Sequence, residues 1–358
     1  MNPGAEQKIK IGNRVIGVGH PVFMIAEMSG NHNGDIKRAH AIIDAAADAG
    51  ADALKLQTYT ADTITLNSDR PEFTLTWQGK TRTLYELYQE GTTPWEWHAE
   101  LFKHARERGM VPFSSPFDTT AVDFLEGLKS ELYKVASFEV VDIPLLEAIG
   151  KTGKPVIVSR GMSTFAELEL AVKTLRDAGT KDIVILQCVS AYPAKPEDMN
   201  LTMIPYLAER FGVMAGLSDH TLTNDSAIAA VALGARAIEK HMTDARAEGG
   251  VDSEFSLEPA EFKALVTSVR VVDSALGKPS DVRGTREQGE ARFRKSLFAA
   301  ADIKKGEAFT DKNVRSVRPG AGLPPKYYHQ ILGKHATEDI SFATPLAWPL
   351  IEGGQPVD

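Results

Sequence analysis

Short apolar runs alternate with amphipathic stretches along most of the chain. Each run is almost continuously apolar, which is typical of parallel strands that are buried on both faces. Eight such runs occur, at residues 22–28, 53–58, 111–115, 132–137, 155–159, 183–190, 213–218 and 237–241. The pattern therefore predicts eight parallel strands.

The stretches between these runs carry helical patterns. Residues 36–49 place Ile42, Ile43 and Ala46 on one face, and Thr164 and Glu167 have the spacing of a capping box. Eight strands that alternate with helices make up a (β/α)8 TIM barrel. A doubly wound open sheet is the alternative, but no strand is followed by the G-x-G-x-x-G dinucleotide motif. We therefore predict an α/β chain whose residues 1–283 form a barrel.

The pattern of residue types along the chain changes after residue 283. Residues 284–295 are charged and contain glycine, and we interpret them as a linker. Residues 296–358 carry short strand-like pieces separated by turns, which predicts a small, mostly β domain. Since a domain of this size is marginally stable alone, we expect it to dock on a partner surface. Within the barrel, the long insertion at residues 61–91 lies on a βα loop, where insertions are usually functional.

Composition narrows the class of protein. The 358 residues carry a formal net charge of −8, which argues against non-specific binding to nucleic acid. Cys188 is the single cysteine, which excludes an internal disulfide and fits a reducing compartment. The first residues show no secretory pattern, and no apolar run reaches the ~18 residues of a membrane span. We expect a cytoplasmic protein that binds neither nucleic acid nor membranes.

Lysines within three apolar strands are candidate functional residues, because charged side chains are unusual in buried strands. Catalysis in such barrels takes place at the carboxyl ends of the strands. Lys55, Lys134 and Lys240 lie on three different predicted strands. A single buried lysine is usually paired in a salt bridge. Three of them could instead converge on an anion, because lysine is a natural partner for phosphate or carboxylate.

Two histidines, His220 and His241, stand one βα unit apart at strand ends. This spacing places two imidazoles on the same rim of the barrel, where they could hold a divalent metal such as Mn²⁺ or Zn²⁺. Two buried histidines that are simply hydrogen-bonded would have the same spacing. The residues alone leave both interpretations open.

Several motifs together resemble one family, the nonulosonic (sialic) acid synthases. They are residues 25–34 (IAEMSGNHNG), 55–57 (KLQ), 133–139 (YKVASFE), 216–221 (GLSDHT) and 239–241 (EKH). Residues 313–320 (NVRSVRPG) are similar to part of the antifreeze-like (SAF, β-clip) domain that closes those enzymes. Within the family, residues 77–80 (WQGK), 84–88 (LYELY) and 93–97 (TPWEW) look most like the pseudaminic acid synthases.

The resemblance implies a transferase that forms a carbon–carbon bond. Phosphoenolpyruvate (PEP), an open-chain N-acetylated sugar and water would give a nine-carbon 2-keto acid and phosphate. For the subfamily, the sugar would be 2,4-diacetamido-2,4,6-trideoxy-L-altrose and the product pseudaminic acid. The alternatives are an N-acetylneuraminic or legionaminic acid synthase with another N-acetylated sugar, or a carbohydrate-binding protein without catalytic activity.

The resemblance also implies roles for individual residues. His220 and His241 would bind a divalent metal, Mn²⁺ with Mg²⁺ or Co²⁺ as alternatives, and Glu27 would be the general base. The residues implied to bind PEP are Lys55, Ser115, Lys134, Ser137, Ser159, Ser190 and Ser218. Those implied to contact the sugar are Gln57, Glu139, Tyr192, Asp252 and Arg318.

Three further features follow from the same comparison of motifs. Arg318 matches an arginine that the SAF domain inserts into the barrel of a second copy, which implies a domain-swapped homodimer. Arg160 stands where the family pattern has a threonine. Ser190 stands where sialic acid synthases often have asparagine, which leaves the anion contact at that position open.

Overall fold

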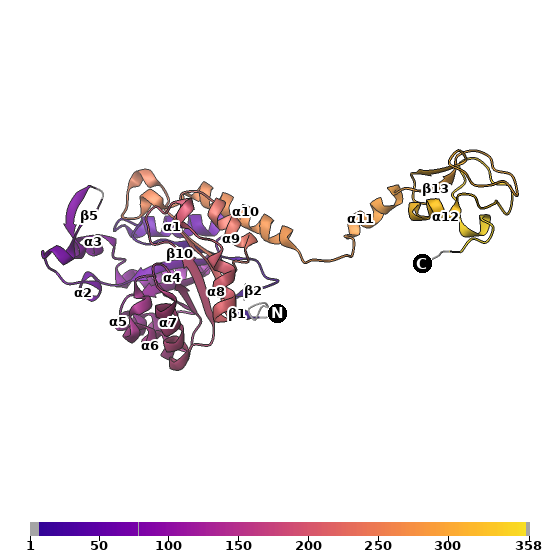
Figure 1. The fold of residues 1–358 in the computed structure, drawn as a ribbon. Coiled ribbons are helices and arrows are strands. Elements are labelled where there is room, and N and C mark those ends of the chain that lie inside the picture. Colours follow the sequence, from indigo (N-terminus) through magenta and orange to yellow (C-terminus); the bar gives the residue numbers. More distant parts are fainter. Residues whose placement is uncertain (1–6, 78, 356–358) are drawn as a thin grey trace. The chain divides into compact units, whose positions relative to one another are not determined.

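The computed structural model describes residues 7–77 and 79–355. Residues 1–6 and 356–358, at the ends of the two predicted domains, and Gln78 of the insertion motif lie outside the described residues. The chain divides into two compact units, Met1–Gly277 and Lys278–Asp358 (Figure 1). Among the described residues, no helix is long and apolar enough to cross a membrane.

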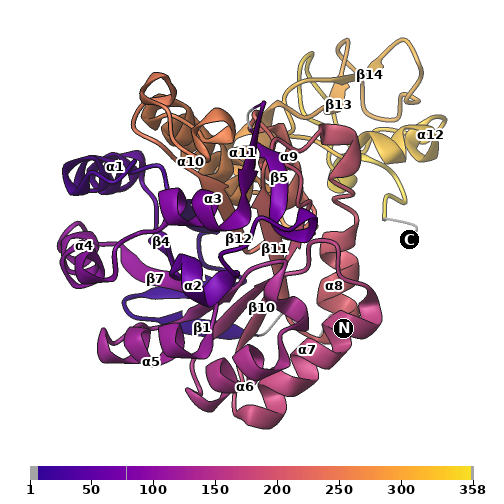
Figure 2. The ribbon, with the colours of Figure 1, turned by 90° about the vertical axis from the view of Figure 1, so that its left-hand side faces the viewer.

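Eight parallel strands form a closed barrel in the first unit (Figure 2). Around the barrel they follow one another in the order β10-β11-β12-β3-β4-β7-β8-β9. Each strand overlaps one of the eight predicted apolar runs, so the predicted barrel is confirmed. The strands are β3 (Phe23–Glu27), β4 (Ala53–Thr58), β7 (Val111–Pro116), β8 (Tyr133–Val135), β9 (Val156–Ser159), β10 (Ile183–Cys188), β11 (Met214–Asp219) and β12 (Ala237–His241).

Helices follow the strands and cover the outside of the barrel. Asp35 caps the first of them by accepting a hydrogen bond from the Lys37 amide, and Gly50 ends it at a φ of 92°. The capping box of Thr164 and Glu167 is confirmed at the start of α7. These helices are α1 (Ile36–Ala49), α4 (Trp95–Glu107), α5 (Thr119–Gly127), α6 (Ile143–Lys151), α7 (Phe165–Ala178), α8 (Met203–Phe211), α9 (Asp225–Ala232) and α10 (Pro259–Leu276).

A hairpin closes the amino end of the barrel interior. Its strands β1 (Lys8–Ile11) and β2 (Arg14–Gly17) pair antiparallel. Ile11 and Ile16 are buried in the same apolar cluster as Phe23 and Met214, which begin two barrel strands. The sequence analysis did not predict this hairpin, because four-residue strands are too short to show a clear alternation. The interior is thus apolar and filled at this end, which leaves the carboxyl end for a site.

The long insertion folds into a small structure of its own beyond β4. It contains α2 (Ala61–Ile64), the 3-10 turn η2 (Pro71–Phe73), a hairpin of β5 (Thr74–Trp77) and β6 (Lys80–Thr83), and α3 (Leu84–Gly91). Figures 1 and 2 both place α2, α3 and β5 at one end of the barrel. Since the insertion follows the carboxyl end of β4, this is the end at which barrel active sites occur.

The second unit is small and has its own core. The segment predicted to be a linker contains α11 (Thr285–Glu290) and the 3-10 turn η7 (Ala291–Phe293). Beyond it, β13 (Ser296–Ala299) and β14 (Val314–Val317) pair antiparallel, and α12 (Tyr328–Ile331) follows. Isolated bridges such as that of Ile303 with Ile340 connect the remaining segments. Leu297, Phe309, Ile331 and Leu346 are buried in the core.

Candidate active site

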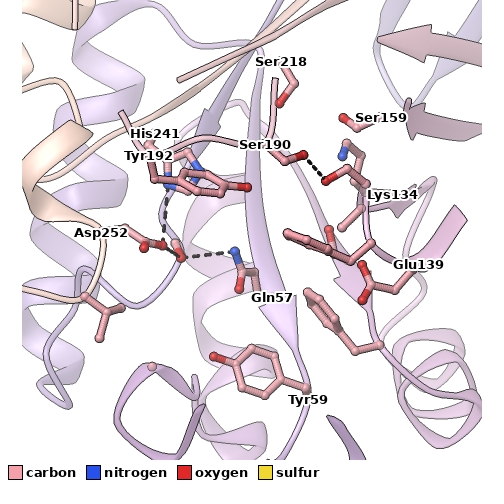
Figure 3. A pocket seen from close by; sticks show the side chains of 18 of the residues that line it. Gln57, Tyr59, Lys134, Glu139, Ser159, Ser190, Tyr192, Ser218, His241 and Asp252 are labelled. Carbon is pink, nitrogen blue, oxygen red and sulfur yellow. Dashed lines mark hydrogen bonds and ion pairs between the residues drawn. The ribbon is translucent and has the colours of Figure 1, made fainter. Parts of the chain in front are cut away.

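A cavity of about 520 Å³ opens at the carboxyl ends of the barrel strands (Figure 3). Every barrel strand, or the loop that follows it, contributes to the lining. Alternate residues of a strand point to the same face, so Lys55 and Gln57 both reach the cavity from β4. The predicted residues among its lining are Lys55, Gln57, Ser115, Lys134, Ser137, Glu139, Ser159, Ser190, Tyr192, Ser218, His220, His241 and Asp252.

Two predicted residues lie outside this lining. Glu27, at the end of β3, is buried directly behind it and is linked to two lining residues. Arg318 belongs to the second unit, where it follows β14 and has an exposed side chain. The structure therefore brings together all the predicted site residues of the barrel unit.

Lys55 holds two buried carboxylates together at the floor of the cavity. Its Nζ lies 2.9 Å from Glu27 Oε2 and 2.9 Å from Glu239 Oε1. Burial lowers the pKa of Lys55 to about 8, although Glu239 opposes this shift. Burial alone would raise the pKa of Glu239, but Lys134 and Lys55 together hold it at about 2. Glu239 was not among the predicted site residues.

Lys134 is less tightly bound than Lys55. Its Nζ is 3.7 Å from Glu239 Oε1 and donates a 3.3 Å hydrogen bond to the Val135 carbonyl. Ser115 Oγ and Ser159 Oγ are buried near it and have no hydrogen-bond partner among the described residues. A cation and hydroxyl donors that are not engaged elsewhere are the groups that an anion needs.

A pair of serine hydroxyls extends this surface. Ser137 Oγ and Ser190 Oγ lie 2.8 Å apart and come from the loops after β8 and β10. Gly161, with a φ of 50°, packs against them so closely that a Cβ atom would stand 2.3 Å from the Ser137 Cβ. Only glycine fits there, because both the backbone conformation and the space exclude a side chain.

His220 and His241 lie side by side at the ends of the neighbouring strands β11 and β12, with ring centroids 5.4 Å apart. The Nδ1 of His220 donates to the Val189 carbonyl over 2.8 Å, which leaves its Nε2 as an unprotonated ligand atom. His241 Nδ1 is buried without a hydrogen-bond partner among the described residues. Burial lowers the pKa of both imidazoles, so both are neutral.

Neutral imidazoles with free ring nitrogens fit a divalent metal. Residues 7–77 and 79–355 contain no group of three or more His, Cys, Asp or Glu side chains arranged to hold a metal ion. A metal at this histidine pair would therefore take its remaining ligands from substrate or water.

Asp252 and Glu139 are carboxyl groups with raised pKa values. Ser29 Oγ donates to Asp252, and Gln57 Nε2 donates to Ser29 Oγ over 3.1 Å and to Glu27 Oε1 over 3.2 Å. Burial raises the pKa of Asp252 to about 6. Burial also raises the pKa of Glu139 to about 7, and its Oε2 is buried without a partner among the described residues. Both groups can exchange protons near neutral pH.

The hypothesis that three lysines converge on an anion is wrong for Lys240. Its side chain points away from the cavity, and its Nζ donates to Asp219 Oδ2 over 2.7 Å and to the Thr221 and Thr223 carbonyls. Because Lys240 precedes His241 and Asp219 precedes His220, this fully buried pair joins β11 to β12 behind the histidines. Its effect is to fix their spacing.

Arg160 also lies outside the cavity lining. Its guanidinium donates to Gln187 Oε1 and to the Ser163 carbonyl, both over 3.4 Å, and stacks over the Phe165 ring at 5.5 Å. The arginine therefore packs on the loop after β9 and on the start of α7.

The sequence analysis missed several lining residues besides Glu239. Ser29, Tyr59, Phe117 and Cys188 reach the cavity from barrel strands or their loops. An apolar group comes from the insertion, and the i, i+3, i+4 spacing of its helical members could have revealed them as one face of a helix. This group consists of Ile64, Leu75, Leu84, Leu87 and Tyr88.

The fold and the site together define a TIM-barrel enzyme whose cavity offers cationic and hydroxyl groups suited to an anion beside a pair of histidines. The chain belongs to the NeuB family. The family's model matches residues 42–281, and the model of the SAF domain matches residues 294–352.

Two synthases from one strain of Campylobacter jejuni are similar to the chain. Its pseudaminic acid synthase is 46% identical over 91% of this chain and 95% of its own length. Its N,N'-diacetyllegionaminic acid synthase is 37% identical over 88% of this chain and 96% of its own length. The crystal structure of N-acetylneuraminic acid (sialic acid) synthetase from Leptospira borgpetersenii is also similar. It has a TM-score of 0.72 and 34% identity, and covers 79% of this chain and 95% of that one.

Replacement of Glu139 by glutamine should stabilise the ligand-free protein at high pH. The folded-state pKa of about 7 exceeds the ordinary 4.5, so the folded state retains the proton that the unfolded chain loses. The wild type thus loses stability between pH 4.5 and 7, by about 3 kcal/mol at most. Thermal unfolding of Glu139→Gln and wild type at pH 5 and pH 8 measures the difference, which should grow at pH 8. Exposed Glu254→Gln is the matched control, and a Glu139→Gln difference independent of pH would contradict the prediction.

Proposed function

We propose that the protein is a pseudaminic acid synthase, which condenses PEP with 2,4-diacetamido-2,4,6-trideoxy-L-altrose and water to give pseudaminic acid and phosphate. The observation that carries this proposal is the higher identity to a pseudaminic acid synthase than to a legionaminic acid synthase of the same strain. The chemistry of the cavity is consistent with it, since the floor suits an anion and the rim offers titratable groups.

In this proposal PEP lies over the floor of the cavity. Lys134 and the free hydroxyls of Ser115 and Ser159 bind its phosphate and carboxylate, with Lys55 nearby. Ser137, Ser190 and Ser218 complete the set of hydroxyls around the anion. Because Lys134 has only long contacts to its neighbours, it can turn toward an anion without breaking a close ion pair.

The reaction forms one carbon–carbon bond and one carbon–oxygen bond, from C2 of PEP to water, and breaks the carbon–oxygen bond from C2 to phosphate. The methylene carbon of PEP bonds to the aldehyde carbon of the sugar, whose oxygen takes up a proton. Water then adds to C2 of PEP, and Glu27 accepts a proton from it. The C2 hydroxyl then loses its proton as the bond from C2 to the phosphate oxygen breaks, which leaves a ketone and inorganic phosphate. The two protons lost by water balance those taken up by the sugar oxygen and by phosphate. Gln57, which lines the cavity, donates to Glu27 Oε1 and so connects this carboxylate, buried behind the lining, to the site.

We place a divalent metal, Mn²⁺ with Mg²⁺ or Co²⁺ as alternatives, at His220 and His241. When bound, such a cation supplies Lewis-acid polarisation of the aldehyde oxygen. On the sugar side, Glu139, Tyr192 and Asp252 are close enough to the histidines and the floor to contact the sugar's hydroxyl and acetamido groups, since all three line the same cavity.

The proposed substrate is tested by phosphate release. Purified protein, PEP and Mn²⁺ are mixed with the altrose sugar, with the legionaminic acid precursor or with N-acetylmannosamine, and the products are analysed by mass spectrometry. We expect phosphate and a nine-carbon keto acid with the altrose sugar only. Turnover with N-acetylmannosamine alone would instead favour an N-acetylneuraminic acid synthase. If PEP alone fails to raise the unfolding temperature, the protein is a sugar-binding protein rather than a PEP enzyme.

Removal of the metal should abolish turnover. We expect EDTA to stop phosphate release and Mn²⁺ to restore it, because the two imidazoles are neutral and partly unpartnered. His241→Ala should lose bound Mn²⁺ in equilibrium dialysis and keep its fold, whereas the exposed control His329→Ala should bind Mn²⁺ as the wild type does. Activity that persists after thorough chelation would refute the assignment of the metal.

We also propose that the enzyme works in the cytoplasm as a domain-swapped homodimer. In it, Arg318 of the partner subunit contacts an acetamido group of the sugar. The exposed side chain of Arg318 is available for such a contact. A small domain that enters a partner's site would exclude water from the reaction.

Complementation between two variants tests the swapped arrangement. Arg318→Ala should raise the KM for the sugar and leave PEP binding unchanged, and His241→Ala should be inactive. When both variants are co-expressed, half of the dimers contain one chain of each. In a swapped arrangement each of these mixed dimers has one complete site and one site with both defects. We therefore expect about a quarter of wild-type activity at low sugar concentration. An unswapped enzyme would recover none, because each chain would then carry one defective group in its only site.

A further inference from the structure

One wall of the cavity is apolar and comes from the insertion alone. Ile64 of α2, Leu75 of β5, and Leu84 and Leu87 of α3 line it. We call these four residues the apolar wall. They are half-buried, whereas four residues of the floor, Lys55, Ser115, Lys134 and Ser159, are almost completely buried inside the barrel. The apolar wall therefore borders the outer part of the cavity, beyond the strand ends.

Among the residues that the structure describes, the apolar wall is not part of either hydrophobic cluster of the barrel. Half-buried aliphatic groups that face a cavity rather than a core gain stability only when something apolar covers them. Their partner should therefore be the ligand.

The insertion holds the apolar wall in a defined position. The β5–β6 hairpin pairs Thr74 with Thr83, and Thr83 also caps α3 in a capping box with Glu86. The hydroxyl of Tyr85 donates to Asp62 Oδ1 over 3.1 Å and so links α3 to α2. These links order the surface before substrate binds, which reduces the entropic cost of binding.

Tyr59 joins the apolar wall to the barrel. Its ring packs edge-to-face on Tyr88 of α3, with centroids 5.8 Å apart, and on Phe117 after β7, with centroids 5.2 Å apart. Figure 3 shows Tyr59 at the opposite side of the view from Ser159 and Ser218 of the floor. A ligand whose anionic part lies on the floor would thus present its other end to the aromatic and aliphatic side chains.

We propose that the apolar wall selects the sugar by burying its C6 methyl group and its acetamido methyl groups. This inference rests on the function proposed above, because only a 6-deoxy, di-N-acetylated sugar carries three methyl groups. A C6 hydroxyl would lose hydrogen bonds to water against the aliphatic side chains without replacement. Discrimination by an apolar surface against one added hydroxyl is limited to about 100-fold.

The test compares two sugars that differ in one atom. They are 2,4-diacetamido-2,4,6-trideoxy-L-altrose and its counterpart with a C6 hydroxyl, 2,4-diacetamido-2,4-dideoxy-L-altrose. We expect the wild type to prefer the deoxy sugar by about 10- to 100-fold in kcat/KM. Equal kcat/KM values for the two sugars would overturn the inference and leave the proposed function standing. Absence of phosphate release with either sugar would overturn both.

Substitutions in α3 identify the apolar wall as the cause of the preference. Leu84→Gln and Leu87→Gln keep a good helix former and replace apolar surface by an amide. Each should raise the KM for the deoxy sugar and lower the preference at least about fivefold, with the KM for PEP unchanged. Leu66→Gln is the matched control, since Leu66 lies in the same insertion but is 66% exposed and outside the cavity lining. It should behave as the wild type.

Leu87→Ala keeps the test decisive if the polar variants unfold. It removes apolar contact and adds no polar group, so it should raise the KM for the deoxy sugar several-fold while PEP still raises the unfolding temperature. An unchanged KM for the deoxy sugar in Leu87→Ala and in the folded glutamine variants would overturn the inference. An equal loss of kcat/KM for both sugars would overturn it as well, because the effect would then not depend on the C6 methyl group.

Discussion

The buried ion pairs of Lys55 with Glu27 and Glu239 determine how the rest of the site is arranged. They connect the ends of β3, β4 and β12, three adjacent strands of the barrel. Removal of one partner from such a cluster leaves an uncompensated buried charge, which typically costs about 3–5 kcal/mol. The cluster therefore keeps the strand ends in register. Its one excess negative charge is offset by the nearby and less constrained Lys134, which can turn toward an incoming anion.

The site carries polar groups that contribute nothing to the stability of the ligand-free protein. Within residues 7–77 and 79–355, the buried hydroxyls of Ser115 and Ser159 and the buried Nδ1 of His241 have no hydrogen-bond partner, and burial raises the pKa of Glu139 toward neutrality. Each unpaired buried group costs roughly 1–3 kcal/mol. Such a concentration of unsatisfied groups at one end of a barrel indicates that ligands complete their hydrogen bonds, and the well-packed interior beneath offsets the cost.

The cavity combines two surfaces with different origins. The barrel supplies a polar floor from strand residues whose positions are fixed by the closed sheet. The insertion supplies an aliphatic and aromatic surface on a loop, where change does not disturb the barrel. The relatives include synthases of two different acids, pseudaminic acid and N,N'-diacetyllegionaminic acid. In the proposed function, this separation would let the sugar-binding surface change without a change in the anion site. The Asp219–Lys240 pair behind the histidines belongs to the barrel.

Much of this protein could be predicted from the sequence by itself. The eight apolar runs, the helical stripes between them and the polar residues at the strand ends determined the barrel, its carboxyl-end site and about half of the residues that line it. Tertiary structure alone decided which face each side chain takes, because a strand buried on both faces is apolar throughout and hides the alternation. That is why Lys240 was grouped with Lys55 and Lys134, although His241 next to it must face the other way. The tertiary structure also decided that the insertion folds over the cavity. The sequence could not show this, because leucines that contact a core and leucines that contact a ligand follow the same pattern.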